Sequence, residues 1–322
     1  MDTEKSKKFS NIMANVSDGL SKAASATADT AKNIANKTKD AADKTKEAVV
    51  AAIDTNGNGQ IDIEDIIIQG MRVPYVHVDR AEFLRKELFK RYPEEVIEKA
   101  VAATPLKAGI DTSEIDKIAD SVIQYERNAV SGISAALGMP GGAAVIATIP
   151  ADIIQYYGFM LRATQKLLYL YGFPQLDTAE GDHKLDTETL NILTICLGVM
   201  YGAAGANNAL KTMAKALATG VEKKLLNTAL TKGTIYPIVK NVAKWFGQKM
   251  TKDVFAGFFK KAIPVVGGVL GGGITYMSFK PCCDKLKESL QNTMLSNPNY
   301  RLTAEEEKLY DDFANAIEVE TY

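Results

Sequence analysis

Three long stretches without a charged residue constrain this chain more than any other feature. They cover residues 129–151, 189–210 and 262–279. Each has roughly the 20 residues that a helix needs to cross a bilayer. All three are diluted by small or polar residues, and Pro140 and Pro264 interrupt two of them. Because dense small residues let helix backbones approach closely in water or in lipid, two interpretations stay open: a tightly packed helical core or buried helical hairpin, or membrane insertion, either constitutive or conditional.

The remaining sequence also favours helices. No stretch alternates apolar and polar residues over several positions, so signals for strands are nearly absent. Amphipathic helices are predicted over three segments: Asp79–Tyr92, Pro93–Ala103, and Thr112 to about Gly138. Another helix is expected to open at Pro150, with Asp152 in its first turn. The sequence therefore predicts an all-α helical bundle with glycine-rich central helices and a long N-terminal amphipathic helix.

Glycines at helical spacing suggest how two of the uncharged stretches could pack together. Four glycines in the third stretch form two pairs spaced four residues apart: Gly267, Gly268, Gly271 and Gly272. In a helix this spacing gives a strip of bare backbone, which a second helix could approach closely. The expected partner is the 189–210 helix, which has its own glycines at Gly198, Gly202 and Gly205.

The N-terminal region carries an eleven-residue repeat. Its small or apolar positions are Phe9, Leu20, Ala31, Ala42 and Ile53, with lysines and acidic residues between them. Eleven residues are close to three helical turns, so these positions form one nearly straight stripe. A solvated helix, a helix lying on lipid and a coiled-coil partner are all compatible with this pattern.

A calcium-binding loop of the EF-hand type is predicted at DTNGNGQIDIED, residues 54–65. Calcium takes six to eight oxygen ligands, which a twelve-residue loop supplies from alternate positions. The predicted ligands are Asp54, Asn56, Asn58, Gln60 through its carbonyl, Asp62 and Asp65. Gly59 occupies the sixth position, where the turn requires a positive φ, and Ile61 the eighth, where an apolar side chain anchors the loop.

Two features of this loop depart from the usual pattern. Its twelfth position is Asp65, where most such loops have glutamate, and this resembles the loops of dockerins. Three carboxylates and a short final ligand predict modest affinity. No second loop occurs in the sequence. The alternative is a turn rich in asparagine and glycine that never binds metal.

Several functional classes receive no support. A net charge of -1 gives no bulk basicity for nucleic acid. His77 and His183 lie in no metal or nucleophile spacing, and the glycine run lacks the lysine of a P-loop, so no enzyme is predicted. The three cysteines make no disulfide framework, and no secretory signal is visible, which together favour a reducing compartment.

Two motifs resemble the EcsC protein family of bacteria. They are LGMPGGAAVIATIPADIIQYYGFMLRATQKLLYLYGFP and, some ninety residues later, KKAIPVVGGVLGGGITY. The resemblance covers about Met71 to Leu290. It implies a bacterial, membrane-proximal, all-α protein, to which the N-terminal helix and the calcium loop are additions.

The expected organisation is an amphipathic helix over 1–53, the calcium loop and its exit helix over 54–70, and an EcsC-like helical domain over 71–322. The expected function is a calcium-binding, membrane-associated, non-enzymatic protein, in which calcium orders the N-terminal helix against the body. It would be cytoplasmic and peripheral to the membrane, with a membrane surface, a membrane protein or a second copy of itself as partner. The alternative is a soluble helical scaffold whose glycine-rich helices are core.

Overall fold

The computed structural model describes residues 47, 50–138, 143–177, 185–220, 230, 235–246, 267–297 and 299–320. For the helix ends at 135–138, 143–152, 267–274 and 315–320 it describes the backbone alone. The chain divides into Met1–Ala51 and Ala52–Tyr322, and the second unit is described below. Helices and connecting turns make up the described residues, with no strand among them, which confirms the predicted all-α class. The N-terminal eleven-residue stripe lies almost entirely outside the described residues.

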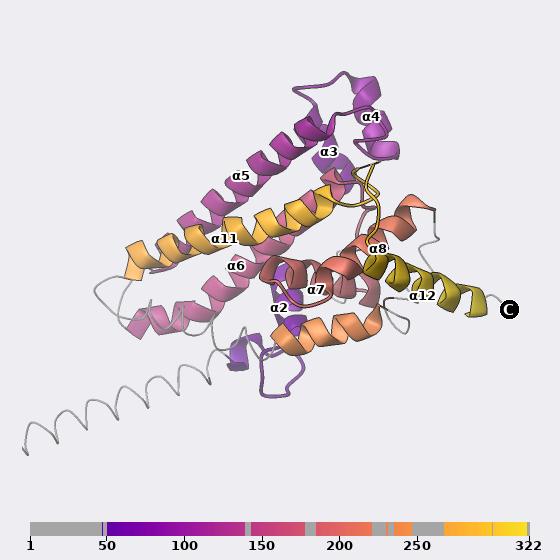
Figure 1. The fold of residues 1–322 in the computed structure, drawn as a ribbon. Helices are drawn as coiled ribbons and strands as arrows, with labels where there is room; N and C mark the ends of the chain where they lie inside the picture. Colours follow the sequence, from indigo (N-terminus) through magenta and orange to yellow (C-terminus); the bar gives the residue numbers. More distant parts are fainter. Residues whose placement is uncertain are drawn as a thin grey trace, which may run out of the picture. The chain divides into compact units, whose positions relative to one another are not determined.

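Three long helices form one packed group in the second unit. They are α5 (Thr112–Gly138), α6 (Ala143–Leu170) and α11 (Gly267–Gln291). Figure 1 shows α5 beside both α6 and α11, and the three helices contact one another pairwise. The bounds of α5 agree with the prediction from sequence.

The start of α6 differs from the prediction. This helix begins at Ala143, so Pro150 lies inside it and Asp152 is not in its first turn. The residues from Ala143 to Ile149, AAVIATI, are alanine and β-branched residues, which a helix accepts at a small cost. A proline inside a helix removes one backbone hydrogen bond and strains the preceding turn, but it does not have to end the helix.

Shorter helices surround this group. The calcium loop leads into α2 (Ile63–Met71), which packs against α6 and α7. An α3–α4 pair follows, with α3 at Arg80–Leu88 and α4 at Glu94–Ala102. Asp79 caps α3 by accepting a hydrogen bond from the Glu82 N–H at 2.7 Å. Pro93 is the N-cap of α4, one residue before the helix begins, whereas the prediction made it the first residue of the helix. α3 ends at Leu88, short of the predicted Tyr92, because the chain turns there to enter α4.

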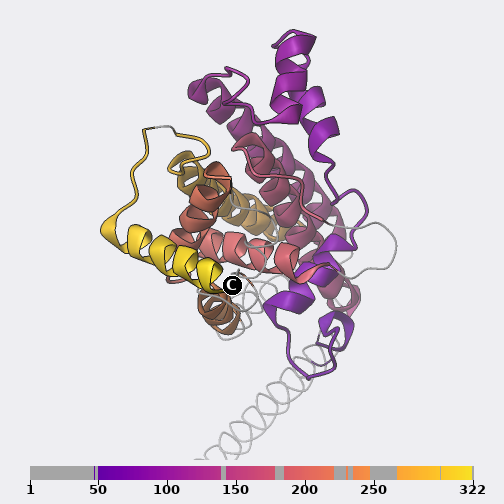
Figure 2. The same cartoon turned by 90° about the vertical axis from the view of Figure 1, so that its right-hand side faces the viewer.

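The second uncharged stretch forms two helices, whereas one was predicted. α7 (Thr187–Tyr201) and α8 (Ala206–Ala218) are joined by a turn in which Gly202 and Gly205 have φ values of 77° and 80°. This left-handed backbone favours glycine, so these two glycines serve the turn and not a helix contact. α12 (Ala304–Glu320) packs on α8, and Figure 2 shows the two helices in a view turned by 90°.

Gly198 is a close-contact glycine, as predicted, but its partner is different. A Cβ atom on Gly198 would lie 2.7 Å from Cγ1 of Val242, in the helix over residues 236–246. The run of Gly267, Gly268, Gly271 and Gly272 belongs to the backbone of α11. What surrounds those four glycines lies outside the described residues.

A chain of aromatic rings links the helices of the core. The Tyr156 ring of α6 meets Phe279 of α11 edge-on at 6.0 Å between centroids, and it meets Tyr157 at 5.3 Å. Tyr201, at the end of α7, continues the chain to Phe246 at 5.2 Å. Edge-to-face pairs of this kind add stability beyond the area that they bury.

A buried ion cluster joins α5 to α6. Glu126 is fully buried, and its Oε1 lies 2.5 Å from Nζ of Lys166 and 3.4 Å from Nε of Arg162. Its second oxygen has no hydrogen-bond partner among the described protein groups. The polar side chains of α6 at Arg162 and Lys166 therefore take part in an internal ion network with Glu126.

Candidate metal centre

The predicted calcium loop spans Asp54 to Asp65, between a helical turn at 50–53 and α2. Apolar side chains fix it at both ends, because Ile53 is fully buried and Ile61 and Ile63 are nearly so. Gly59 has a φ of 77°, the left-handed conformation that the sixth position was predicted to need. The burial of Ile61 and the backbone of Gly59 are therefore those expected for an EF-hand type of loop.

Backbone N–H groups of the loop surround the first predicted ligand, Asp54. Its Oδ1 accepts hydrogen bonds from the N–H groups of Gly57 at 2.7 Å and Asn56 at 3.2 Å, and its Oδ2 accepts one from Gly59 at 2.8 Å. These donors, the Gly59 N–H most of all, hold the pKa of Asp54 below its ordinary value. The carboxylate therefore stays ionised, which is the state that binds a cation.

Three predicted ligands converge inside the loop. Asn56 and Asn58 each direct a side-chain amide towards Asp62, and their Nδ2 atoms lie 3.1 and 3.4 Å from its Oδ2. The Oδ1 atoms of the two asparagines accept hydrogen bonds from the N–H groups of Asn58 at 3.0 Å and Gln60 at 2.8 Å. The loop is thus curled so that one carboxylate oxygen and two amide groups share a common centre.

The last predicted ligand, Asp65, has a different position. It is fully buried, and its Oδ1 accepts hydrogen bonds from the N–H of Thr55 at 2.8 Å and from the Thr55 hydroxyl at 2.5 Å. Its Oδ2 accepts the N–H of Asp62 at 3.0 Å, while Asp62 Oδ1 accepts the N–H of Asp65 at 3.0 Å. This reciprocal capping box starts α2. Asp65 therefore closes the loop end to end.

The donor set fits calcium only if amide oxygens take part. Among the described residues, no group of three or more histidine, cysteine, aspartate or glutamate side chains is placed to hold a metal ion. Calcium accepts amide and backbone carbonyl oxygens alongside carboxylates. A half-turn of the Asn56 and Asn58 amides would exchange Nδ2 for Oδ1 at nearly the same place, at the cost of the two backbone hydrogen bonds that Oδ1 now accepts. Asp54, Asp62 and the Gln60 carbonyl would complete the set.

Sequence reasoning missed the role of Thr55. Nothing in the spacing of calcium ligands marks the second position of the loop, so its bonds to Asp65 could not be predicted. The capping box could have been predicted, because an acidic residue three positions after Asp62 and just before an apolar run is its usual signature.

Along the part of the chain that the structure describes, no helix combines the length and the apolar character needed to cross a membrane. Comparisons with protein-family models, with curated proteins and with solved structures found no match for this chain.

Proposed function

We propose that this chain is a calcium-binding, membrane-associated protein without catalytic activity, which holds one calcium ion in the loop Asp54–Asp65. The convergence of the Asn56 and Asn58 amides on Asp62 carries this proposal. A turn that merely reversed the chain would need asparagines for local backbone bonds, but it would not need their amides to meet at one carboxylate. Positive φ at Gly59 and the ionised Asp54 support the same interpretation.

The loop is positioned to pass the effect of an ion to the rest of the second unit. Its final residues are the first turn of α2, and α2 packs against α6 and α7. Replacing the internal hydrogen bonds of the loop by bonds to calcium would therefore stiffen the start of α2. That change is the proposed output of calcium binding. The predicted ordering of the N-terminal helix concerns residues outside the described part of the chain.

The membrane-associated part of the proposal rests on the sequence. The eleven-residue stripe and the uncharged stretches are compatible with a cytoplasmic protein that lies against a membrane, and the resemblance to the EcsC family implies a membrane-proximal protein. Calcium would then set how strongly the protein attaches.

Calorimetry on the full chain tests calcium binding. We expect one site with modest affinity, and we expect its heat to vanish when Asp54→Ala and Asp65→Ala are combined. The matched control is Asp311→Ala combined with Asp312→Ala, which removes two exposed carboxylates from α12. Equal calcium binding by the loop variant and the native protein would place the site elsewhere and overturn the proposal.

Flotation with liposomes tests the membrane part separately. The full chain is mixed with vesicles that contain anionic lipid, with calcium or with a chelator. Stronger flotation in calcium, abolished by the loop variant, is the expected result. Absence of flotation under both conditions would reject membrane association and favour the soluble scaffold, whatever calorimetry shows.

A further inference from the structure

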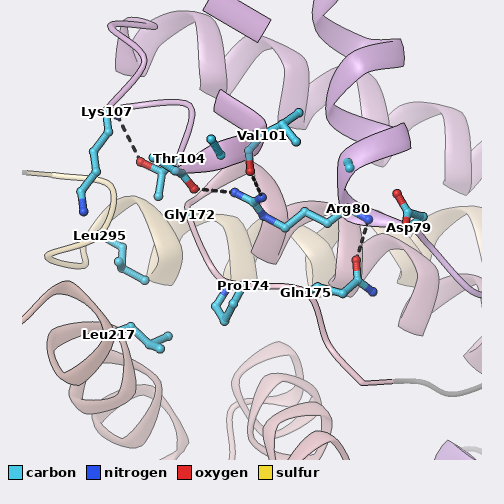
Figure 3. Close-up of a pocket in the computed structure, with 13 residues that line it drawn as sticks. Asp79, Arg80, Val101, Thr104, Lys107, Gly172, Pro174, Gln175, Leu217 and Leu295 are labelled. Carbon is cyan, nitrogen blue, oxygen red and sulfur yellow. Dashed lines mark hydrogen bonds between the residues drawn. The ribbon is translucent and has the colours of Figure 1, made fainter. Parts of the chain in front are cut away.

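A cavity of about 430 Å³ lies where the start of α3 meets the end of α4. Its walls come from both helices, from the segment after α6 that includes Gly172 and Pro174, and from Leu217 and Leu295 (Figure 3). Arg80 extends across one side of this cavity, and Lys107 and Thr104 lie on another (Figure 3). The calcium loop contributes nothing to it.

Arg80 is a buried cation without a carboxylate partner. Its side chain donates hydrogen bonds to the carbonyl oxygens of Phe173 at 3.1 Å, Val101 at 2.7 Å and Ala103 at 2.7 Å, with a longer one to Ala100 at 3.3 Å. No ion pair of Arg80 occurs among the described residues. A guanidinium has five N–H groups, so one hydrogen on Nη1 is left over. The charge is offset only by carbonyl dipoles, most of them from the end of α4.

The other unused polar groups on the same side are also donors. Thr104 Oγ1 accepts the N–H of Lys107 at 3.1 Å, which leaves its hydroxyl hydrogen free to donate. The Lys107 ammonium has no ion pair among the described residues. Gln175 is already occupied, since it accepts the N–H of Arg80 at 2.6 Å and donates to Leu176 and Val78. One carboxylate, Asp79, also lines the cavity, and Figure 3 shows it on the side away from Lys107.

An apolar surface continues from this cavity. Pro174 and Leu217 belong both to it and to a neighbouring cavity of about 250 Å³, so the two adjoin. The second cavity is lined mainly by apolar side chains: Phe173, Leu176, Ile192, Met213 and Leu217. Its acidic lining residues, Asp177 and Glu188, would repel an anion and keep a negative head group on the Lys107 side.

We propose that the two adjoining cavities bind a small amphiphile that has one anionic head group, held by Lys107, Thr104 and Arg80, and an apolar tail lying over Pro174 and Leu217. Phosphate and carboxylate heads share the required chemistry, because either accepts charge-assisted hydrogen bonds from ammonium and guanidinium groups. Pockets that combine a mostly apolar lining with a few convergent polar groups are typical of small-molecule sites. This site is independent of the proposed calcium site.

Isothermal titration calorimetry of the full chain tests the site with four probes: octyl phosphate, octanoate, octanol and inorganic phosphate. We expect at least one of the two anionic amphiphiles to bind, and the tighter of them identifies the head group. Octanol and inorganic phosphate should each bind at least about tenfold more weakly, because each lacks one half of the recognised chemistry.

Variants locate the binding. Lys107→Glu should weaken the amphiphile by about tenfold or more, since it replaces an attractive charge by a repulsive one. Lys90→Glu is the matched control, because Lys90 is exposed, lies outside the cavity lining and undergoes the same charge change. Circular dichroism checks that both variants fold. No binding of either anionic amphiphile, equal binding of octanol, or equal affinity in the Lys107→Glu variant would each overturn the proposal.

Discussion

Gly70 of α2 and Gly158 of α6 pack backbone against backbone. A Cβ atom on Gly158 would lie 3.0 Å from the carbonyl oxygen of Gly70 and 3.1 Å from Cβ of Val73. A Cβ atom on Gly70 would lie 2.9 Å from Cδ1 of Leu161 and 3.3 Å from the nitrogen of Gly158. The helix that leaves the calcium loop is therefore seated directly on the backbone of α6. Because this contact leaves almost no free space, a movement of α2 that begins at the calcium loop would press on the backbone of α6.

Gly158→Ala should lower the free energy of unfolding by about 1–3 kcal/mol, because the new methyl group must push against a backbone carbonyl. Gly132→Ala in α5 is the matched control. Nothing lies within 4 Å of the Cβ position at Gly132, so the better helix propensity of alanine should stabilise the protein by up to about 1 kcal/mol. Urea denaturation of both variants measures the difference. Equal stability of the two variants would contradict the close contact of α2 with α6.

The sequence predicted the helical class and α5 well, because Thr112 starts a long amphipathic pattern that runs to Gly138. It did not predict that Pro150 lies inside α6, or that Gly202 and Gly205 form a turn between two helices. Proline and glycine occur both at helix ends and inside helices. Local pattern gives no means to choose between those two uses. Contacts between residues distant in sequence could not be predicted either, such as the ion pair of Glu126 with Lys166, which are 40 residues apart.

Glu126→Gln should destabilise the protein by about 3–5 kcal/mol, because the buried Lys166 and its neighbour Arg162 lose their counter-charge. Urea denaturation at neutral pH measures this loss. Glu98→Gln is the control, since Glu98 pairs with Arg85 at a site where both side chains are about half exposed. Exposed pairs contribute about 1 kcal/mol or less.

A second variant distinguishes charge from packing at Glu126. Combining Glu126→Gln with Lys166→Met removes one of the unpaired cations and leaves an apolar side chain of similar length. The double variant should be more stable than Glu126→Gln alone, because the remaining Arg162 is partly exposed and can be hydrated. If the second change adds a further loss, the cluster is held by packing and not by charge.

Glu306 makes the contact of α12 with α8 sensitive to acid. Its Oε1 lies 2.9 Å from Nζ of Lys211, and its Oε2 accepts hydrogen bonds from the Tyr300 hydroxyl at 2.7 Å and the Thr303 N–H at 2.9 Å. Burial raises the pKa of Glu306, but these donors outweigh it and leave that pKa below its ordinary value of 4.5. The stabilisation is therefore present above about pH 4.5 and is lost as the pH falls through the lower folded-state pKa.

The Glu306→Gln variant should accordingly be less stable than the native protein by about 1.5–3 kcal/mol at pH 6. The difference should shrink as the pH is lowered below 4.5, the ordinary value of this carboxyl. Denaturation curves at a series of pH values measure it. Glu305→Gln, at the exposed neighbouring position, should differ little from the native protein at every pH. A gap between native and Glu306→Gln that stays constant down to pH 3 would disprove this role of Glu306.

The candidate metal centre was predicted in part. Gly59 and Ile61 have the backbone and burial that their loop positions required, since turn geometry and an apolar anchor follow from spacing alone. The different roles of Asp54 and Asp65 could not be predicted. Both are acidic residues at ligand positions, and only the fold shows that Asp65 is buried and bonded to Thr55 while Asp54 faces the exposed part of the loop.

Because Asp54 and Asp65 have different roles, replacing each by alanine should change the free energy of unfolding by different amounts when no metal is present. In a chelator, Asp65→Ala should lower the free energy of unfolding by about 1–3 kcal/mol, because it leaves the N–H groups of Thr55 and Asp62 without their acceptor at the start of α2. Asp54→Ala should lower it much less, because water can replace the acceptor for the exposed N–H groups of Asn56, Gly57 and Gly59. Thermal unfolding in chelator measures both variants. In calcium, each variant should also lose the stabilisation that the ion gives the native protein: Asp54→Ala because it removes a charged ligand, and Asp65→Ala because the loop is no longer held closed around the ligands. Equal destabilisation of the two variants in chelator would show that Asp65 does not hold the loop closed.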